Sequence, residues 1–137
     1  MRVVIDTNVL ISASYFGGKP QQAIQTIKEQ AIDFFTSKEI QNEYKEVFMR
    51  MNQKGFHPNK EAQNILNYTI RSSITIETIK SHIQCRDPKD NKFIDCALSA
   101  NADFIITGDN DLLVLKQIES TKIVTVDEFL TLFIKNN

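Results

Sequence analysis

In the stretch RVVIDTN, residues 2–8, an apolar run over residues 2–5 leads directly into the acid Asp6. A second run of the same kind, residues 104–106, continues into Thr107-Gly108-Asp109-Asn110-Asp111. A carboxylate is costly to desolvate at the end of a buried strand, and a shared divalent cation would offset that cost. The two runs therefore predict one acidic pocket that is assembled from distant parts of the chain.

Short apolar runs alternate along the chain with longer stretches of helical periodicity. The predicted strands are residues 2–5, 33–36, 74–76, 104–106 and 123–126. The predicted helices are residues 8–14, 20–30, 38–51, 60–72, 91–101, 112–116 and 127–135, with Ser37 and Asn59 as N-caps. This alternation predicts an α/β fold, a three-layer α/β/α sandwich around a mainly parallel, Rossmann-like sheet of about five strands. Such sheets bind ligands outside the carboxyl ends of their strands, where Asp6 and Asp109 are expected.

The bulk properties favour a single cytoplasmic domain over residues 1–137. Hydrophobic residues make up 42% of the chain, and no run approaches the ~20 apolar residues of a membrane span, so no membrane partner is expected. Cys85 and Cys96 match no close metal or redox spacing and are expected to be buried or idle thiols. The net charge of −1 neither indicates nor excludes nucleic-acid binding, because a local basic rim can offset an acidic pocket.

The predicted helix over residues 38–51 carries three acids, and helical geometry separates them. Its apolar side chains form one stripe centred near Val47 and Met51. Glu43 falls roughly 85° from that centre, at the border of the buried face, whereas Glu39 and Glu46 fall about 125° and 145° away. We therefore expect Glu43 to face the pocket and the other two to be solvated.

The helix after Pro88 offers two candidate acids. Its buried stripe, extended back by one turn, reaches Asp90 at the helix N-terminus, where Asp90 could also act as an N-cap. Asp95 lies about 130° from the stripe centre, where it either flanks the site or faces water. Helical geometry favours Asp90 as the third acid of the pocket.

Two further acids follow the fourth predicted strand. Asp109 comes two residues after Thr107 across Gly108, which would let the backbone turn and present both side chains to the rim. Asp111 is more readily explained as the N-cap of the short helix over residues 112–116, and it stands at the margin of the predicted site.

Four segments together resemble a PIN domain, and more narrowly the toxin branch related to VapC ribonucleases. The segments are Asp6-Thr7-Asn8-Val9-Leu10, Asn42-Glu43-Tyr44, Asp87-Pro88-Lys89-Asp90-Asn91-Lys92-Phe93-Ile94-Asp95 and Thr107-Gly108-Asp109-Asn110-Asp111-Leu112. By resemblance, the catalytic acids are Asp6, Glu43, Asp90 and Asp109, with Asp95 as the alternative third acid, and Asn8 and Thr107 support the site.

The resemblance implies a metal-dependent endoribonuclease that cleaves single-stranded RNA. Asp6, Asp90 and Asp109 would bind Mg²⁺ or Mn²⁺, because both ions favour carboxylate oxygens and acidify bound water. Glu43 would bind a second ion or orient the attacking water. The toxin branch further implies a small antitoxin partner and a homodimer. The basic residues beside the acids, among them Arg86, Lys89 and Lys92, would hold the RNA.

Other classes of protein fit these residues less well. A haloacid-dehalogenase-type phosphatase would need an acid two residues after Asp6, where Asn8 stands. A response-regulator receiver would need a lysine at the end of a late strand, and Lys122 precedes the fifth predicted strand instead. The main alternative is a PIN-like module that binds nucleic acid or protein without catalysis, and such a module would be expected to lack some of the acids.

Overall fold

A computed structural model describes residues 1–134 of the chain, in which helices and strands alternate. The strands are β1 (Arg2–Ile5), β2 (Asp33–Thr36), β3 (Ile74–Thr75), β4 (Phe104–Ile106), β5 (Gln117–Ile118) and β6 (Thr121–Val124). The helices are α1 (Thr7–Tyr15), α2 (Gly18–Glu29), α3 (Lys38–Gln53), α4 (Lys60–Arg71), α5 (Asn91–Ser99), α6 (Asn110–Leu113) and α7 (Val126–Thr131). A 3-10 turn, η1 (Pro88–Asp90), leads directly into α5.

The six strands form one sheet in the order β3-β2-β1-β4-β6-β5. All neighbouring pairs are parallel except the β5–β6 hairpin. β1 occupies the middle of the sheet, and its residues Val3, Val4 and Ile5 are fully buried. A central parallel strand is covered on both faces, which is why β1 is a continuous apolar run and does not alternate apolar with polar residues.

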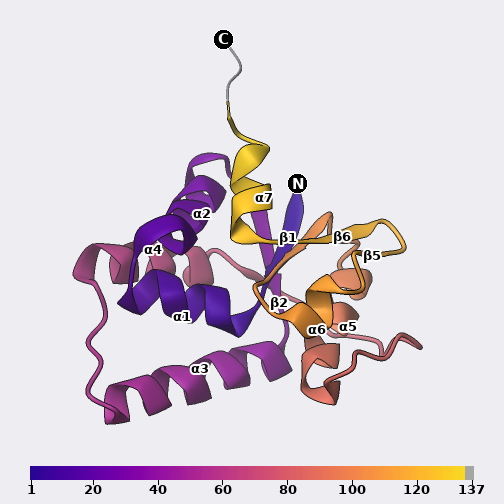
Figure 1. Cartoon of the computed structure of the whole chain (residues 1–137), viewed down its shortest axis with the longest axis horizontal. Coiled ribbons are helices and arrows are strands. Elements are labelled where there is room, and N and C mark those ends of the chain that lie inside the picture. Colours follow the sequence, from indigo (N-terminus) through magenta and orange to yellow (C-terminus); the bar gives the residue numbers. More distant parts are fainter. Residues whose placement is uncertain (135–137) are drawn as a thin grey trace.

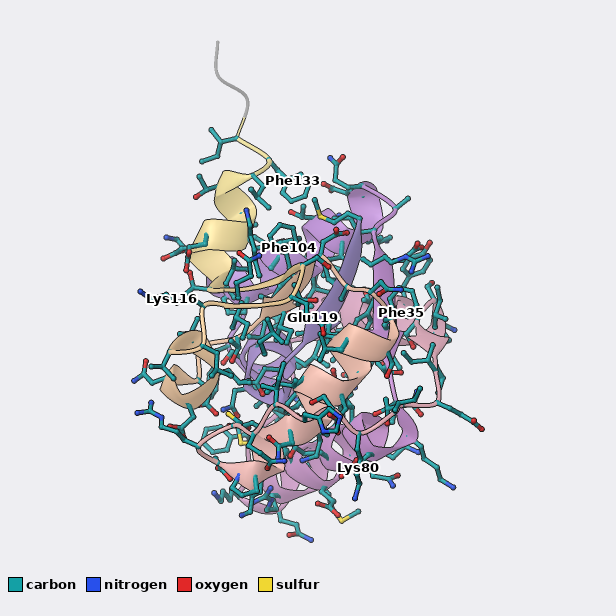
Figure 2. All side chains as sticks on the ribbon, turned by 90° about the vertical axis from the view of Figure 1, so that its right-hand side faces the viewer. Phe35, Lys80, Phe104, Lys116, Glu119 and Phe133 are labelled. Carbon is teal, nitrogen blue, oxygen red and sulfur yellow. The ribbon has the colours of Figure 1, made fainter. Side chains whose placement is uncertain are left out.

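Helices cover both faces of the sheet, so the predicted three-layer α/β architecture is confirmed. Figure 1 shows α1, α2 and α4 together on one side of β1, with α5 and α6 on the other side. α5 packs against β1, β2 and β4, whereas α7 packs against β6 and α2. Phe129 of α7 lies between Phe104 and Phe133, with ring centroids 6.4 Å and 5.2 Å away, and the last two side chains are labelled in Figure 2.

The end of the chain differs most from the sequence prediction. β5 was not predicted, because it has only two residues and its hairpin turn uses Glu119 at a φ of 53° in place of the usual glycine or asparagine. The strand predicted over residues 123–126 corresponds to β6, which covers Thr121–Val124. It ends before Thr125 because Thr125 forms a capping box with Glu128 and is the N-cap of α7. The predicted end of the last helix, residue 135, lies outside the described residues.

The other predicted elements are confirmed to within a few residues. Ser37 and Asn59 are the N-caps of α3 and α4, and their side chains accept hydrogen bonds from the backbone N–H groups of Ile40 (3.2 Å) and Ala62 (3.1 Å). The two cysteines are buried free thiols, as expected. Within residues 1–134, no helix is both long enough and apolar enough to span a bilayer.

Candidate functional site

The ends of the two neighbouring strands β1 and β4 form the floor of the candidate site. The backbone N–H of Asp6 donates to the Ile106 carbonyl at 3.0 Å, so the residues that leave these strands start side by side. Asp6 is only 3% exposed and directly precedes α1. Because β1 and β4 are parallel, their carboxyl ends meet at one edge of the sheet, and this pairing brings Asp6 next to Thr107 and Asp109.

Thr107 joins the two acids through its hydroxyl group. Its Oγ1 donates to Asp6 Oδ2 at 2.7 Å and accepts from the Asp109 backbone N–H at 2.9 Å. The hydroxyl is fully buried, and a threonine has one proton to donate and lone pairs to accept, so both of these contacts can be satisfied together. This geometry fits the supporting position expected for Thr107.

The pKa of Asp6 is raised above its ordinary value, chiefly because burial disfavours the charged form. The Thr107 hydroxyl and the backbone N–H of Asn8 oppose the shift, whereas the charges of Asp109 and Glu43 add to it. The Asn8 side chain itself is exposed, and no hydrogen bond joins it to Asp6 in the described part of the chain. Asp6 therefore lies where a cation would favour its ionised form.

Asp109 caps the short helix α6, which corrects the assignment of that cap to Asp111. Asp109 Oδ1 accepts from the Asp111 backbone N–H at 2.9 Å, and the helix begins at Asn110 instead of Leu112. The neighbouring Gly108 is not among the glycines of the described chain that adopt a positive φ, and a Cβ there would meet nothing within 4 Å. The backbone turn between Thr107 and Asp109 therefore does not depend on glycine.

Among the acids of the site, Asp90 has the pKa that is raised furthest above its ordinary value. It is 8% exposed, and its Oδ2 has no hydrogen-bond partner among the residues that the structure describes. Burial, a side-chain hydrogen bond with Asp109, and the charges of Asp109, Asp6 and Asp87 together raise the pKa of Asp90 to about 8. A buried carboxylate oxygen without a partner, surrounded by other carboxylates, is the arrangement that a bound cation would stabilise.

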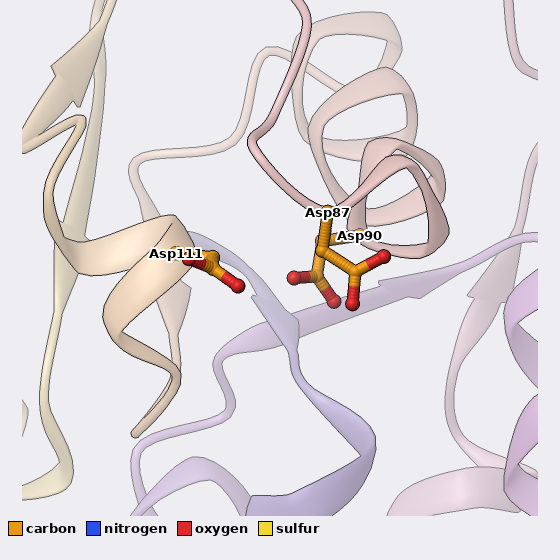
Figure 3. A group of neighbouring side chains, drawn as sticks. All are labelled: Asp87, Asp90 and Asp111. Atoms are coloured by element: carbon orange, nitrogen blue, oxygen red, sulfur yellow. The ribbon is translucent and has the colours of Figure 1, made fainter.

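A second group of acids shares Asp90 with the first. One carboxylate oxygen from each of Asp87, Asp90 and Asp111 lies within 4.8 Å of the other two (Figure 3). Asp87 caps η1 by accepting from the Lys89 backbone N–H at 3.0 Å, and Asp111 pairs with Arg86 at 3.0 Å. The sequence prediction left out Asp87, although its position directly before Pro88 is a typical N-cap signal that would have placed it beside Asp90.

All of these oxygen atoms suit a hard divalent cation. Mg²⁺ and Mn²⁺ favour carboxylate oxygens, and crowded carboxylates need a positive charge to remain ionised together. The residues present therefore fit a metal site at Asp90, which has Asp6, Asp109, Asp87 and Asp111 as neighbouring acids.

Glu43 reaches the site from α3, as the helical geometry predicted. Its side chain is 24% exposed, whereas Glu39 and Glu46 are exposed. Glu43 Oε2 accepts from the Thr7 hydroxyl, and its Oε1 pairs with Lys92 Nζ at 2.7 Å. Lys92 was predicted only as part of the basic rim, so its direct contact with Glu43 was not anticipated.

Tyr44, the next residue of α3, fastens this helix to the end of β1. It is buried, and its hydroxyl donates to the Ile5 carbonyl at 2.5 Å. Burial raises the pKa of Tyr44 well above its ordinary value, and the nearby charges of Asp6 and Glu43 act in the same direction. A protonated phenol at this point holds Glu43 close to Asp6.

Asp95 has a different partner from the other acids. It lies about 140° around α5 from Asp90, and its Oδ1 accepts from the Ser81 backbone N–H at 2.9 Å. This contact ties the long segment between β3 and η1 to α5. Of the two candidates for the third acid, the structure brings Asp90 together with Asp6 and Asp109 and gives Asp95 a contact with the loop.

Comparisons with known proteins agree with this architecture. A family model described as a PIN domain matches residues 2–111. An uncharacterized protein of Methanocaldococcus jannaschii is 36% identical over 119 residues, which cover 85% of this chain and 76% of that protein. The crystal structure of VapBC2 from Rickettsia felis, bound to a DNA fragment from its promoter, superposes with a TM-score of 0.61. That match covers 91% of this chain and 98% of the other at 13% identity, so it shows a shared fold.

Proposed function

This chain belongs to the PIN-domain family, and we propose that it is a metal-dependent endoribonuclease that cleaves single-stranded RNA. PIN domains are generally nucleases, which makes hydrolysis of a phosphodiester bond the first expectation. The observation that supports it most is the buried Oδ2 of Asp90, which lies within a group of carboxylates and has no hydrogen-bond partner among residues 1–134. A binding module without catalysis would have no need to maintain such an arrangement.

The proposed metal ligands are Asp6, Asp90 and Asp109, directly or through water, with Asp87 and Asp111 on the same rim. When bound there, Mg²⁺ or Mn²⁺ would neutralise charge on the phosphate and lower the pKa of a bound water. Thr107 orients the Asp6 carboxylate through its 2.7 Å hydrogen bond. Glu43, which Thr7 and Lys92 hold in place, orients the attacking water.

Single-stranded RNA is the proposed substrate, because the motifs resemble those of the VapC ribonucleases. The exposed side chains of Arg86 and Lys89 lie beside the acids on the same rim and would contact backbone phosphates. Such contacts release counterions, so binding should weaken steeply as the salt concentration rises. The Asp87-Pro88 turn places both basic residues next to Asp90.

The proposed biological role is that of the toxin in a toxin–antitoxin pair. The structural match is to a chain of VapBC2, a complex bound to promoter DNA, and its fold covers nearly the whole of this chain. We propose a small antitoxin as the protein partner and a homodimer as the assembly. Residues 1–137 are proposed to form a single nuclease domain. The proposed location is the cytoplasm, where cellular RNA is translated.

Cleavage of a fluorophore-quencher RNA by site variants tests this function. Asp90→Asn should lower cleavage in Mg²⁺ or Mn²⁺ by about 100-fold or more, since loss of even a group that supports a metal ligand typically costs 10–100-fold. Asp6→Asn should behave in the same way. Asp95→Asn, in the adjoining helix α5, is the matched control and should cleave at the wild-type rate, because an asparagine can still accept from the Ser81 N–H. Undiminished cleavage by Asp90→Asn would contradict the proposed site.

A further inference from the structure

The ion pair between Lys92 and Glu43 bears on how many metal ions the site holds. Lys92 Nζ lies 2.7 Å from Glu43 Oε1 and 2.7 Å from the Lys89 carbonyl oxygen. The pair is largely enclosed, with side-chain exposures of 12% for Lys92 and 24% for Glu43. It joins α5 to α3 across 49 residues of sequence. Both oxygens of Glu43 therefore already have donors from the protein, the ammonium of Lys92 and the hydroxyl of Thr7.

The position of Lys92 in its helix is unfavourable unless the ammonium has a specific partner. Lys92 is the second residue of α5, and a cation in the first turn of a helix opposes the helix dipole. Holding the long lysine side chain in one enclosed geometry also costs conformational entropy. Glu43 and the Lys89 carbonyl offset these costs, which makes the ammonium a fixed positive charge of the site.

The acids of the site thus differ in how their charge is compensated. Asp90 has a buried oxygen with no partner in the described part of the chain, and other carboxylates surround it. Glu43 has an ammonium in direct contact. A divalent ion on the same oxygen of Glu43 would lie within about 5 Å of Lys92 Nζ, given metal–oxygen distances of about 2.1 Å, and the two cations would repel each other.

We propose that the site holds one divalent cation, at Asp90, and that the ammonium of Lys92 takes the place of a second cation at Glu43. This inference rests on the proposed function, and it assigns Glu43 to the orientation of water instead of metal binding. Lys92 is then a positioning residue, which acts on the reaction through Glu43. Removing its charge should expose Glu43 as a ligand and create a second metal site.

Counting bound Mn²⁺ tests the inference without reference to RNA cleavage. Metal-free protein is titrated with Mn²⁺, and the bound ions are counted by calorimetry and by the electron paramagnetic resonance signal of free Mn²⁺. The wild type should bind one ion and Lys92→Met two. Lys92→Met combined with Glu43→Gln should return to one. Lys89→Met, which removes an exposed charge from the same rim, should also bind one. Lys92→Gln provides a second variant should the methionine variant fail to fold, as monitored by circular dichroism.

Two ions on the wild type, or a single ion on both folded Lys92 variants, would overturn the inference. An absence of bound Mn²⁺ on the wild type would overturn the metal site and this inference together. If the expected counts are observed and the wild type does not cleave RNA, the proposed function alone fails.

Discussion

Asp90 is the acid of the site whose negative charge is most strongly disfavoured by burial and by neighbouring charges. Asp90 lies directly before α5, on the carboxyl rim of the sheet, and its neighbours there are other acids. A folded protein that buries such a group holds a proton on it or binds a cation beside it. The same residue can therefore be probed through proton binding as well as through metal binding.

The metal-free protein should become less stable as the pH rises from about 4 to about 8. The pKa of Asp90 is about 8 in the folded state against about 3.9 in an unfolded chain, so between these values the folded state binds a proton that the unfolded state has released. The stability that this proton contributes is complete below pH 4 and is lost as the pH rises through 8. Asp6, whose pKa is also raised, contributes with the same sign.

Urea unfolding in the presence of a chelator measures this dependence. The free energy of unfolding of the wild type should decline across that pH range, and the decline should be smaller in Asp90→Asn, which cannot ionise. Adding Mn²⁺ should restore stability to the wild type at pH 8. A pH profile that Asp90→Asn leaves unchanged would show that Asp90 does not carry the effect.

Single residues of the site were predictable where one element positions them. The helical period alone placed Glu43 at the border of the buried face and left Glu39 and Glu46 in solvent. The same reasoning led from the buried stripe of α5 back to Asp90. The contact of Lys92 with Glu43 was not predictable in this way, because it depends on how α3 and α5 pack against each other.

At the scale of elements, the segment between β3 and η1 depends on α5 for its order. It has no helix or strand of its own, and α5 holds it through the Asp95 and Ser99 side chains, which accept from the backbone N–H groups of Ser81 (2.9 Å) and Ile79 (3.0 Å). The Cys85 N–H donates to Asn91 Oδ1 at 2.8 Å near the end of the segment. These contacts position Asp87 on the rim beside Asp90.

Limited trypsin digestion tests the role of Asp95 in this segment. Asp95→Ala removes the acceptor for the Ser81 N–H and should accelerate cleavage after the exposed Lys80, which Figure 2 labels. Asp95→Asn keeps an acceptor at the same place and should be cut at nearly the wild-type rate. The metal affinity of both variants should stay close to that of the wild type. Equal digestion of the two variants would contradict the anchoring role.

The short elements and their caps are the features that were not predictable from the sequence. β5 and β6 pair through a two-residue turn with a non-glycine residue in the left-handed region, and no local pattern signals such a turn. α6 begins one residue after Asp109 because that side chain, instead of Asp111, accepts the capping hydrogen bond. Long elements such as α3 and α4 were predictable, because their caps and their periodicity agree.

At the scale of the whole molecule, the parallel sheet is what assembles the site. β1 and β4 are about 100 residues apart in sequence and adjacent in the sheet, and α3 and α5 contact each other close to the ends of these strands. Acids from four separate segments therefore meet at one edge. The sequence allowed the class of fold to be predicted but not the order of the strands, since pairing between distant strands leaves no local trace in the sequence.

Asp6, Asp90 and Asp109 together are proposed to hold a divalent cation. The most direct measurement is anomalous X-ray diffraction near the manganese absorption edge, from crystals of the wild-type protein soaked in Mn²⁺. We expect one strong anomalous peak at coordination distance from Asp90 Oδ2, with Asp6 and Asp109 as direct or water-mediated ligands. A peak bound by Glu43 and not by Asp90, or no peak on this rim at saturating Mn²⁺, would contradict this proposal.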